Sequence, residues 1–336
     1  MGYIITLEDG TCLDQAGDTG LCSSTELFGH LYSIHVLGGR RDDMAKERFE
    51  LFRTFFRGEA LEFLQRGVDM ALEEDGQDLT SNGVFSGSDS LSALLVAKEP
   101  TLLAGLPLVE VILQRLGAED SVRVRHLVPE GSRVRDGDGV CRLEGSAASI
   151  LRAERVIINY VAHLSGVADL TARFTERMRG SGTRLVDTRK TLPCLRYPEK
   201  YAVRVGGGHN HRMNLAQMLM LKDNHVDRAG GISRAVARLR EAYSPCPPIV
   251  VECRTEEEVD QAVAAHVERI LLDNMGPESL TSALWRIPRG IETEISGGVS
   301  LESIGELAGL GADYVSVGRV TNAARSRDFS MRIESG

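Results

Sequence analysis

The second half of this chain alternates short apolar stretches with longer amphipathic ones, and this alternation restricts the fold more than any other feature. Six stretches typical of strands lie between Thr183 and Gly318, and they read TRLVD, MLMLKD, PIVVEC, RILLDN, IETEISGG and DYVSVG. Segments with helical spacing separate them, among them GGISRAVARLREAY and TEEEVDQAVAAH. Parallel strands need crossover connections, which are usually helices, so the alternation favours a parallel sheet. An α/β barrel is the simplest expectation at this length, and a doubly wound open sheet is the competing one.

The first half of the chain divides by its patterns. Residues 1–50 carry weak periodicity and many turn formers, and we treat them as an extension of uncertain order. Between residues 91 and 146, short strand-like stretches surround one helical segment, which indicates a small α/β or β-rich domain. A long helical pattern follows from Ala147, and Ser165-Gly166 marks a candidate break in it.

Composition and charge exclude several classes of function. The chain has 336 residues and a net charge of −9, and this acidic balance argues against binding to nucleic acid. No apolar run reaches the roughly 18 residues of a membrane-spanning helix, so we expect no membrane partner. The N-terminus shows no secretory signal and the cysteines form no C-x-x-C pair, so we expect free thiols in a cytoplasmic protein. These cysteines are Cys12, Cys22, Cys141, Cys194, Cys246 and Cys253.

Polar side chains follow the predicted strands at the points where the strands end. RLVD leads into Thr188, Arg189 and Lys190, while IVVE and ILLD end on Glu252 and Asp273. The carboxyl ends of parallel strands are where α/β barrels and open sheets place their ligands. We therefore expect a ligand site at this edge of the sheet.

The candidate site residues fall into three chemical groups. Five cationic residues suit a small substrate with two carboxylates, because guanidinium groups bind carboxylates bidentately; these residues are Arg155, Arg189, His211, Arg212 and Lys222. Glu252 and Asp273 suit Mg²⁺ held through water and substrate oxygens, or the stabilisation of a developing positive charge. Strand–glycine–helix turns at Ser296-Gly297-Gly298 and at Gly318 expose backbone N–H groups to a phosphate. Together these groups indicate phosphoribosyl transfer onto an acidic acceptor.

The same motifs resemble those of a known family. DTRKT, EKYAVRVGGGHNHRMNL, LKDNHV, ILLDN, ISGGVSLESI and GADYVSVGRVTNAA follow the order found in quinolinate phosphoribosyltransferases, also called carboxylating nicotinate-nucleotide pyrophosphorylases. The resemblance extends from Gly67 to Ile333. It implies that quinolinate and phosphoribosyl pyrophosphate give nicotinate mononucleotide, pyrophosphate and CO₂ in de novo NAD biosynthesis, with Mg²⁺ as cofactor.

The resemblance also implies an architecture: an open α/β barrel with an N-terminal α/β sandwich domain. We expect the extension at residues 1–50, the sandwich domain at 51–150 and the barrel at 151–319, with the tail at 320–336 returning to the sandwich. The family forms homodimers or higher multiples of dimers. In these assemblies the residue matching Arg155 enters the site of the neighbouring subunit.

Matched position by position, the resemblance assigns a role to each candidate residue. Quinolinate would be bound by Arg155, Arg189, His211, Arg212 and Lys222. Catalysis and the binding of phosphoribosyl pyrophosphate would fall to Lys190, Glu252 and Asp273, of which Glu252 and Asp273 would also hold Mg²⁺. The cradle of the 5′-phosphate would be formed by Ser296, Gly297, Gly298 and Gly318.

Some positions depart from the family pattern. Leu192, Cys194 and Val250 stand where threonine, glycine and glutamate are usual, and Asn322 replaces a histidine. These changes leave open a homologue that acts on another pyridine carboxylate. A family member associated with molybdate transport is another alternative, as is a barrel aldolase or decarboxylase with Lys222 as its Schiff-base lysine.

A few polar residues beside the motifs keep two interpretations. Glu294, His163 and Ser165 suit either the site or local packing. His209 suits a structural hydrogen bond as well as a ligand contact.

Overall fold

The computed structural model describes residues 5–6, 12–13 and 49–334. The chain divides into two units, residues 1–45 and 46–336. In the first unit, β1 (Ile5–Thr6) pairs antiparallel with β2 (Cys12–Leu13). The other residues up to 48 lie outside the described part, so the expected N-terminal extension stays a prediction.

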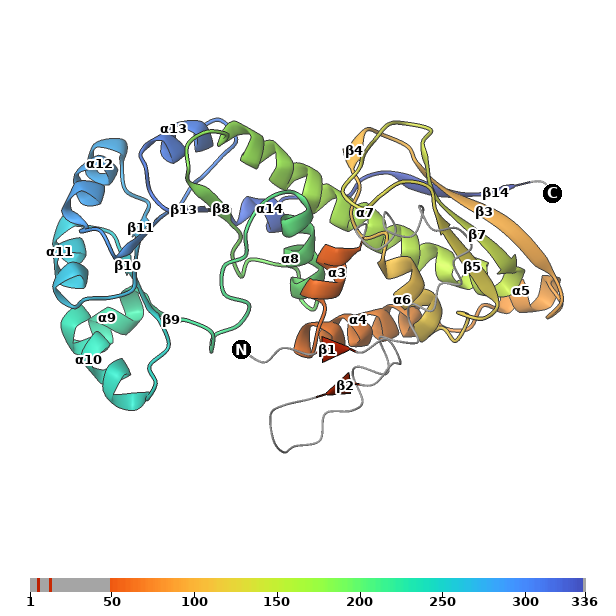
Figure 1. The fold of residues 1–336 in the computed structure, drawn as a ribbon, viewed down its shortest axis with the longest axis horizontal. Coiled ribbons are helices and arrows are strands. Elements are labelled where there is room, and N and C mark those ends of the chain that lie inside the picture. Colours follow the sequence, from red (N-terminus) through yellow and green to blue (C-terminus); the bar gives the residue numbers. More distant parts are fainter. Residues whose placement is uncertain (1–4, 7–11, 14–48, 335–336) are drawn as a thin grey trace. The chain divides into compact units, whose positions relative to one another are not determined.

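The second unit contains an antiparallel sheet of four strands, with the order β14-β3-β7-β5 (Figure 1). The strands are β3 (Ser90–Ala97), β5 (Val122–His126), β7 (Gly139–Ser146) and β14 (Phe329–Glu334). A separate two-stranded sheet joins β4 (Thr101–Leu102) to β6 (Arg133–Val134). In the main sheet, Phe329 of β14 is paired with Ala97 of β3. A strand from the C-terminal end of the chain therefore completes the sheet that β3 begins.

Short helices connect and cover these strands: α3 (Glu50–Phe55), α4 (Glu59–Asp75), α5 (Leu79–Val84) and α6 (Leu108–Arg115). On α4, the buried residues recur at helical spacing because one face of the helix packs into the core; they are Leu61, Leu64, Val68 and Leu72. Asp78 caps α5, since its carboxylate accepts a hydrogen bond from the N–H of Ser81 at 2.9 Å.

One long helix, α7 (Ala147–Arg177), runs for 31 residues from the antiparallel sheet to the barrel (Figure 1). The candidate break at Ser165-Gly166 is wrong, because the helix continues through both residues. A Cβ at Gly166 would lie 2.1 Å from the carbonyl oxygen of Arg325, so glycine here permits a close approach of the C-terminal segment. Oγ of Ser165 accepts a hydrogen bond from the N–H of Ala104 at 3.0 Å, which identifies Ser165 as a packing residue.

The parallel sheet has six strands in the order β8-β13-β12-β11-β10-β9. They are β8 (Arg184–Val186), β9 (Leu219–Leu221), β10 (Ile249–Cys253), β11 (Arg269–Asp273), β12 (Glu292–Ser296) and β13 (Tyr314–Ser316). Strands β9 to β13 follow one another in chain order, and the first strand, β8, joins the last. A doubly wound sheet would reverse its order at a switch point, so this order defines a barrel. No pairing joins β8 to β9 within the described residues, and the barrel is therefore open.

The helices after the strands are α8 (Arg196–Val205), α9 (Asp223–Ala229), α10 (Ile232–Ala242), α11 (Glu256–Ala264), α12 (Pro277–Arg286), α13 (Ile304–Gly309) and α14 (Arg319–Asn322). Helices α9 to α13 follow the outer side of the curved sheet (Figure 1). The predicted fold class, an open α/β barrel with an N-terminal α/β sandwich domain, is confirmed. In the described part of the chain no helix is long and apolar enough to cross a membrane. The described cysteine side chains, Cys141, Cys194, Cys246 and Cys253, are free thiols.

Candidate active site

The register of the parallel strands brings most of the predicted site residues to one edge of the barrel. Asp273, the last residue of β11, is paired with Ser296, the last residue of β12. Glu252 lies one residue before the end of the neighbouring strand β10. Lys190 and Gly318 follow β8 and β13, which are also neighbours. The carboxyl ends of the strands thus gather the acids, the lysine and the glycines.

Lys190 lies against Gly318. A Cβ at Gly318 would lie 2.9 Å from Cδ of Lys190 and 3.4 Å from Oγ1 of Thr188, so a larger residue would displace the lysine. Oγ1 of Thr321 donates a hydrogen bond to the carbonyl oxygen of Lys190 at 2.7 Å and fixes the backbone there. The predicted lysine and one of the predicted phosphate turns therefore adjoin each other.

The turn after β12 has the geometry of an anion cradle. Gly297 has a φ of +97° and Gly298 a φ of +58°, a region that favours glycine. A Cβ at Gly297 would also lie 2.3 Å from Oδ1 of Asn274. Within the described residues, the backbone N–H groups of Gly297, Gly298 and Gly318 donate no hydrogen bond. Free N–H groups at strand-to-helix turns are what phosphate binding requires.

The two predicted acids lie on neighbouring strands. Oε2 of Glu252 pairs with Nζ of Lys222 at 2.8 Å, and Oδ2 of Asp273 accepts a hydrogen bond from the amide of Asn274 at 2.7 Å. Among the described side chains, no cluster of three or more His, Cys, Asp or Glu residues is able to hold a metal. Two carboxylates nevertheless fit Mg²⁺, because this ion prefers oxygen ligands and keeps several waters or phosphate oxygens.

Arg212 and Arg189 carry positive charges without carboxylate partners in the described part of the chain. Nη1 of Arg212 donates to the carbonyl oxygen of Met218 at 2.7 Å, and Nη2 lies 3.7 Å from Sδ of Met220. Burial, followed by the nearby guanidinium of Arg189, lowers the pKa of Arg212. Two neighbouring guanidinium groups without a counter-charge suit an anionic ligand.

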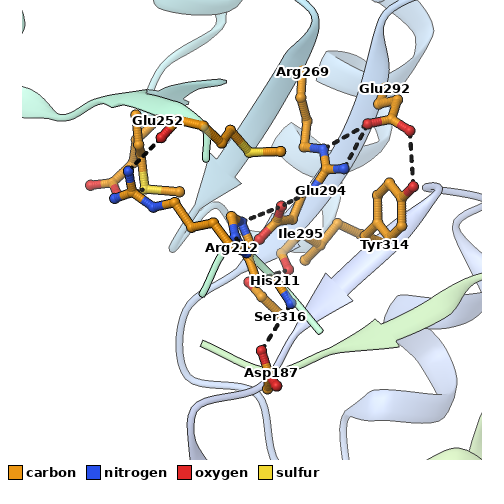
Figure 2. A network of polar contacts seen from close by, with 12 residues as sticks. Asp187, His211, Arg212, Glu252, Arg269, Glu292, Glu294, Ile295, Tyr314 and Ser316 are labelled. Carbon is orange, nitrogen blue, oxygen red and sulfur yellow. Dashed lines mark hydrogen bonds and ion pairs between the residues drawn. The ribbon is translucent and has the colours of Figure 1, made fainter. Parts of the chain in front are cut away.

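His211 is buried inside the barrel, where a network of polar contacts surrounds it (Figure 2). Its backbone N–H donates to Oδ1 of Asp187 at 2.9 Å, and its Nδ1 accepts from the backbone N–H of Arg212 at 2.7 Å. Because Nδ1 is an acceptor, the proton of the neutral ring lies on Nε2. Nε2 is 3.3 Å from Oε2 of Glu294, at ion-pair distance but without the alignment of a hydrogen bond.

Glu294 connects His211 to the opposite end of the barrel. Its Oε2 also accepts from Nη1 of Arg269 at 3.1 Å, and Arg269 in turn binds Glu292 through Nη2 at 2.6 Å. Burial raises the pKa of Glu294, but His211, Arg269 and Ser316 outweigh it, so the pKa lies below its ordinary value. The sequence patterns gave Glu294 two interpretations, a site residue or a packing residue, and did not single out Arg269. A charged residue within an otherwise apolar strand nevertheless indicates a buried ion pair, and this signal was present for Arg269.

Asp187 was also missed as a partner. Its carboxylate is fully buried and binds the ammonium group of Lys200, which is likewise buried. Asn210 donates its side-chain amide to Oδ2 of Asp187 at 2.6 Å. These contacts hold the residues before His211 beside β8, so Asp187 positions the histidine.

Arg155 comes from α7, whereas the other four cationic residues come from the barrel segments after β8 and around β9. Arg155 is exposed on α7, and within the described residues it makes no hydrogen bond or ion pair with them. One chain therefore brings four of the five predicted cations to the barrel edge: Arg189, His211, Arg212 and Lys222.

The loop after Lys190 is held by a buried carboxylate. Glu199 accepts a hydrogen bond from the N–H of Leu192 at 3.2 Å, and Nε2 of His163 lies 2.8 Å from its Oε1. His163 is therefore a structural partner of this loop. Cys194 has a φ of +64°, so this cysteine occupies the backbone conformation that glycine would adopt more readily.

The fold and the site together define an α/β-barrel enzyme for phosphorylated and anionic substrates. Two family models match the chain: quinolinate phosphoribosyl transferase, N-terminal domain, over residues 78–165, and quinolinate phosphoribosyl transferase, C-terminal domain, over residues 167–332. The chain belongs to this family.

Curated relatives and solved structures agree with the family models. The chain is 37% identical to the probable nicotinate-nucleotide pyrophosphorylase (carboxylating) of Bacillus subtilis, over 78% of this chain and 90% of the relative. It is also 37% identical to the nicotinate-nucleotide pyrophosphorylase (carboxylating) of Homo sapiens, over 79% of this chain and 90% of the relative. NadC from Streptococcus pyogenes superposes with a TM-score of 0.75 at 39% identity, covering 80% of this chain and 95% of that one. The nicotinate-nucleotide pyrophosphorylase from Francisella tularensis has a TM-score of 0.77 at 30% identity, with coverage of 83% and 99%.

Proposed function

We propose that this protein is a carboxylating nicotinate-nucleotide diphosphorylase, a pentosyltransferase of NAD biosynthesis. It converts quinolinate and phosphoribosyl pyrophosphate into nicotinate mononucleotide, pyrophosphate and CO₂. The observation that carries the proposal is the pair of guanidinium groups on Arg189 and Arg212, which have no carboxylate partner among the described residues. They belong to the same barrel as the glycine turns, whose backbone N–H groups donate no hydrogen bond within the described residues. The names of its relatives support the same reaction.

The cationic residues would bind the flat diacid. Arg189 and Arg212 would each take a carboxylate, because a guanidinium fork fixes orientation as well as charge. Lys222 would add a third positive charge at the same edge, and His211 would present its ring from a position fixed by Asp187 and Glu294. Binding both carboxylates would set the direction in which the pyridine nitrogen points.

The acids and the glycine turns would bind the activated sugar. Gly297, Gly298 and Gly318 would hold its 5′-phosphate through their N–H groups. Departure of pyrophosphate leaves positive charge on the ribose ring, and the carboxylates of Glu252 and Asp273 would stabilise that charge. Lys190 would neutralise the departing pyrophosphate from its place beside Gly318.

Decarboxylation needs no separate base. Attack by the ring nitrogen on the anomeric carbon produces a pyridinium ring. When the C2–carboxylate bond breaks and CO₂ leaves, its electron pair stays on C2, where the adjacent positively charged nitrogen stabilises it. C2 then takes up a proton from water.

Three further features belong to the proposal. Glu252 and Asp273 would hold Mg²⁺, which when bound would neutralise the charge of the pyrophosphate oxygens. Arg155, exposed on α7, would enter the site of a second copy, so that the active assembly is a homodimer or a multiple of dimers. The free thiols and the anionic small-molecule substrates support a cytoplasmic location.

Turnover of quinolinate with phosphoribosyl pyrophosphate and Mg²⁺, followed by product mass, tests the reaction. We expect nicotinate mononucleotide, with CO₂ and pyrophosphate released in equal amounts. A panel of other pyridine carboxylates is the control, because Leu192 and Cys194 change the loop after Lys190. If another acid reacts while quinolinate gives no product, the protein is a homologue with a different substrate.

A further inference from the structure

A polar cavity lies between the amino ends of three barrel strands and the segment around His209. It has a volume of about 370 Å³. Its polar lining is formed by Arg184, Arg204, His209, Asn210, Arg269 and Tyr314. Arg184, Arg269 and Tyr314 are the first residues of β8, β11 and β13. Arg269 and Asp273 stand at opposite ends of β11, about 13 Å apart at the usual strand rise, and the buried carboxylate of Glu294 lies between Arg269 and His211 of the candidate active site.

The cavity contains more positive charge than the surrounding carboxylates neutralise. Arg269 is paired with Glu292 at 2.6 Å and with Glu294 at 3.1 Å. By contrast, Arg184 and Arg204 form no ion pair with a carboxylate in the described part of the chain. The Arg184 guanidinium lies 4.4 Å from the centre of the Tyr314 ring, and that of Arg269 lies 4.1 Å from it. The Tyr314 ring thus contacts two guanidinium groups that line the same cavity.

His209 supplies another hydrogen-bond donor. Its Nδ1 lies 2.7 Å from Nη1 of Arg204, and since a guanidinium only donates, Nδ1 must accept. The proton of the neutral ring therefore lies on Nε2. Burial, followed by Arg204 and Arg184, lowers the pKa of His209, which favours the neutral ring.

We propose that this cavity, the amino-end anion site, binds a phosphate-type oxyanion. Arg184 and Arg204 present guanidinium forks that match phosphate oxygens, and neither has a carboxylate partner among the described residues. Such an anion would stabilise two positive charges that otherwise repel each other. The site goes beyond the proposed reaction, whose groups lie at the carboxyl ends of the strands.

Calorimetric titration of the full-length protein with inorganic phosphate is the test. We expect two binding events in each wild-type chain, one at the glycine turns and one at the amino-end anion site. The variant Arg184→Gln/Arg204→Gln should lose the second event, with affinity at least tenfold weaker. Arg228→Gln/Arg238→Gln removes the same charge from exposed positions on α9 and α10 and should bind as wild type does.

A second variant separates this site from the proposed active site. Ser296→Asp places a carboxylate in the glycine turn and should abolish only the event there. If the proposed function is wrong, the wild type will show one event, and Arg184→Gln/Arg204→Gln will still remove it. If instead all phosphate binding disappears in Ser296→Asp, or if Arg184→Gln/Arg204→Gln binds as wild type does, the amino-end anion site does not exist.

Three further measurements define the ligand and guard against misfolding. Nuclear magnetic resonance of the His209 ring should show its pKa rising when phosphate binds, because the anion offsets the repulsion from the arginines; no change would contradict the site. Arg184→Lys/Arg204→Lys keeps the charge and should retain part of the affinity. Competition between phosphate and AMP would assign the site to nucleotide phosphates, and lack of competition would assign it to the free ion.

Discussion

Nζ of Lys222 lies 2.8 Å from Oε2 of Glu252, so a residue expected to bind the pyridine acid is paired with one expected to act on the sugar phosphate. The two proposed substrates therefore meet at an ion pair that spans β10 and the residue after β9. This pairing leads to the first prediction.

Lys222→Met and Glu252→Gln should each impair the binding of both substrates. The lysine side chain is 49% exposed, so loss of the pair should cost at most about 1 kcal/mol of unfolding free energy. The effect on kcat/KM should be much larger, about 100-fold for either variant, because both groups face charged substrates. A double-mutant cycle on kcat/KM checks this, with thermal unfolding as control. Additive effects within about 0.5 kcal/mol would show that the two residues act independently.

Arg212→Ala should mainly weaken the binding of quinolinate. Arg212 is half-buried, and losing its contact with a carboxylate that the bound ligand covers is expected to cost about 2–5 kcal/mol. The affinity for phosphoribosyl pyrophosphate should stay close to that of the wild type, because the glycine turns that would hold it are unchanged. Separate titrations with each ligand measure both effects. Equal losses for the two ligands would remove Arg212 from the quinolinate set.

Arg155→Ala and Lys190→Ala should complement each other if Arg155 acts in a second copy. Each variant alone should be nearly inactive. In a mixed dimer, one site combines the intact Lys190 of one chain with the intact Arg155 of the other. Random mixing of the unfolded and refolded variants should then restore about a quarter of wild-type turnover, as expected for twofold symmetry. No recovery, despite mixed dimers on native mass spectrometry, would place Arg155 outside the site.

Glu294→Gln should change how stability depends on pH. The pKa of Glu294 is lowered in the folded protein by His211, Arg269 and Ser316 in spite of burial. Its contribution to stability is therefore present above the ordinary carboxyl pKa and is lost as pH falls through the lower folded value. Denaturant unfolding of the wild type should show this loss at acidic pH, and the variant should show less of it. Parallel pH profiles for the two proteins would contradict the proposed charge on Glu294.

Chelation of Mg²⁺ should stop turnover without preventing quinolinate from binding. In the proposed function, the carboxylates of Glu252 and Asp273 would face the sugar phosphate and hold the metal, whereas the guanidinium groups that would bind quinolinate need no metal. Treatment with EDTA followed by calorimetry with quinolinate measures one effect, and product mass with restored Mg²⁺ measures the other. If quinolinate binding is lost together with turnover, the metal does not act where we propose.

Local patterns predicted the barrel and one edge of it because the relevant information lies close together in the sequence. An apolar run followed by a charged residue indicates the end of a strand, as in ILLD before Asn274. The partners of His211 were harder to foresee, since Asp187 and Glu294 reach it from different strands. The amino-end cluster was missed because Arg184 begins β8 while Arg204 lies in the last turn of α8, so the two come together only in the folded chain. At Gly166 a local pattern was misleading. Glycine there suggested a break in the helix, but the helix continues, and the missing side chain allows the backbone of Arg325 to approach closely.

Helix α7 extends without interruption for 31 residues, about 46 Å at the rise of an α-helix. It contributes to the core of the antiparallel sheet at its start and packs against α8 of the barrel further along. Because one continuous helix belongs to both parts, it provides no hinge about which the antiparallel sheet and the barrel would move toward each other. Any shielding of reactants from water must then come from short loops, such as the one carrying Cys194, or from a neighbouring molecule.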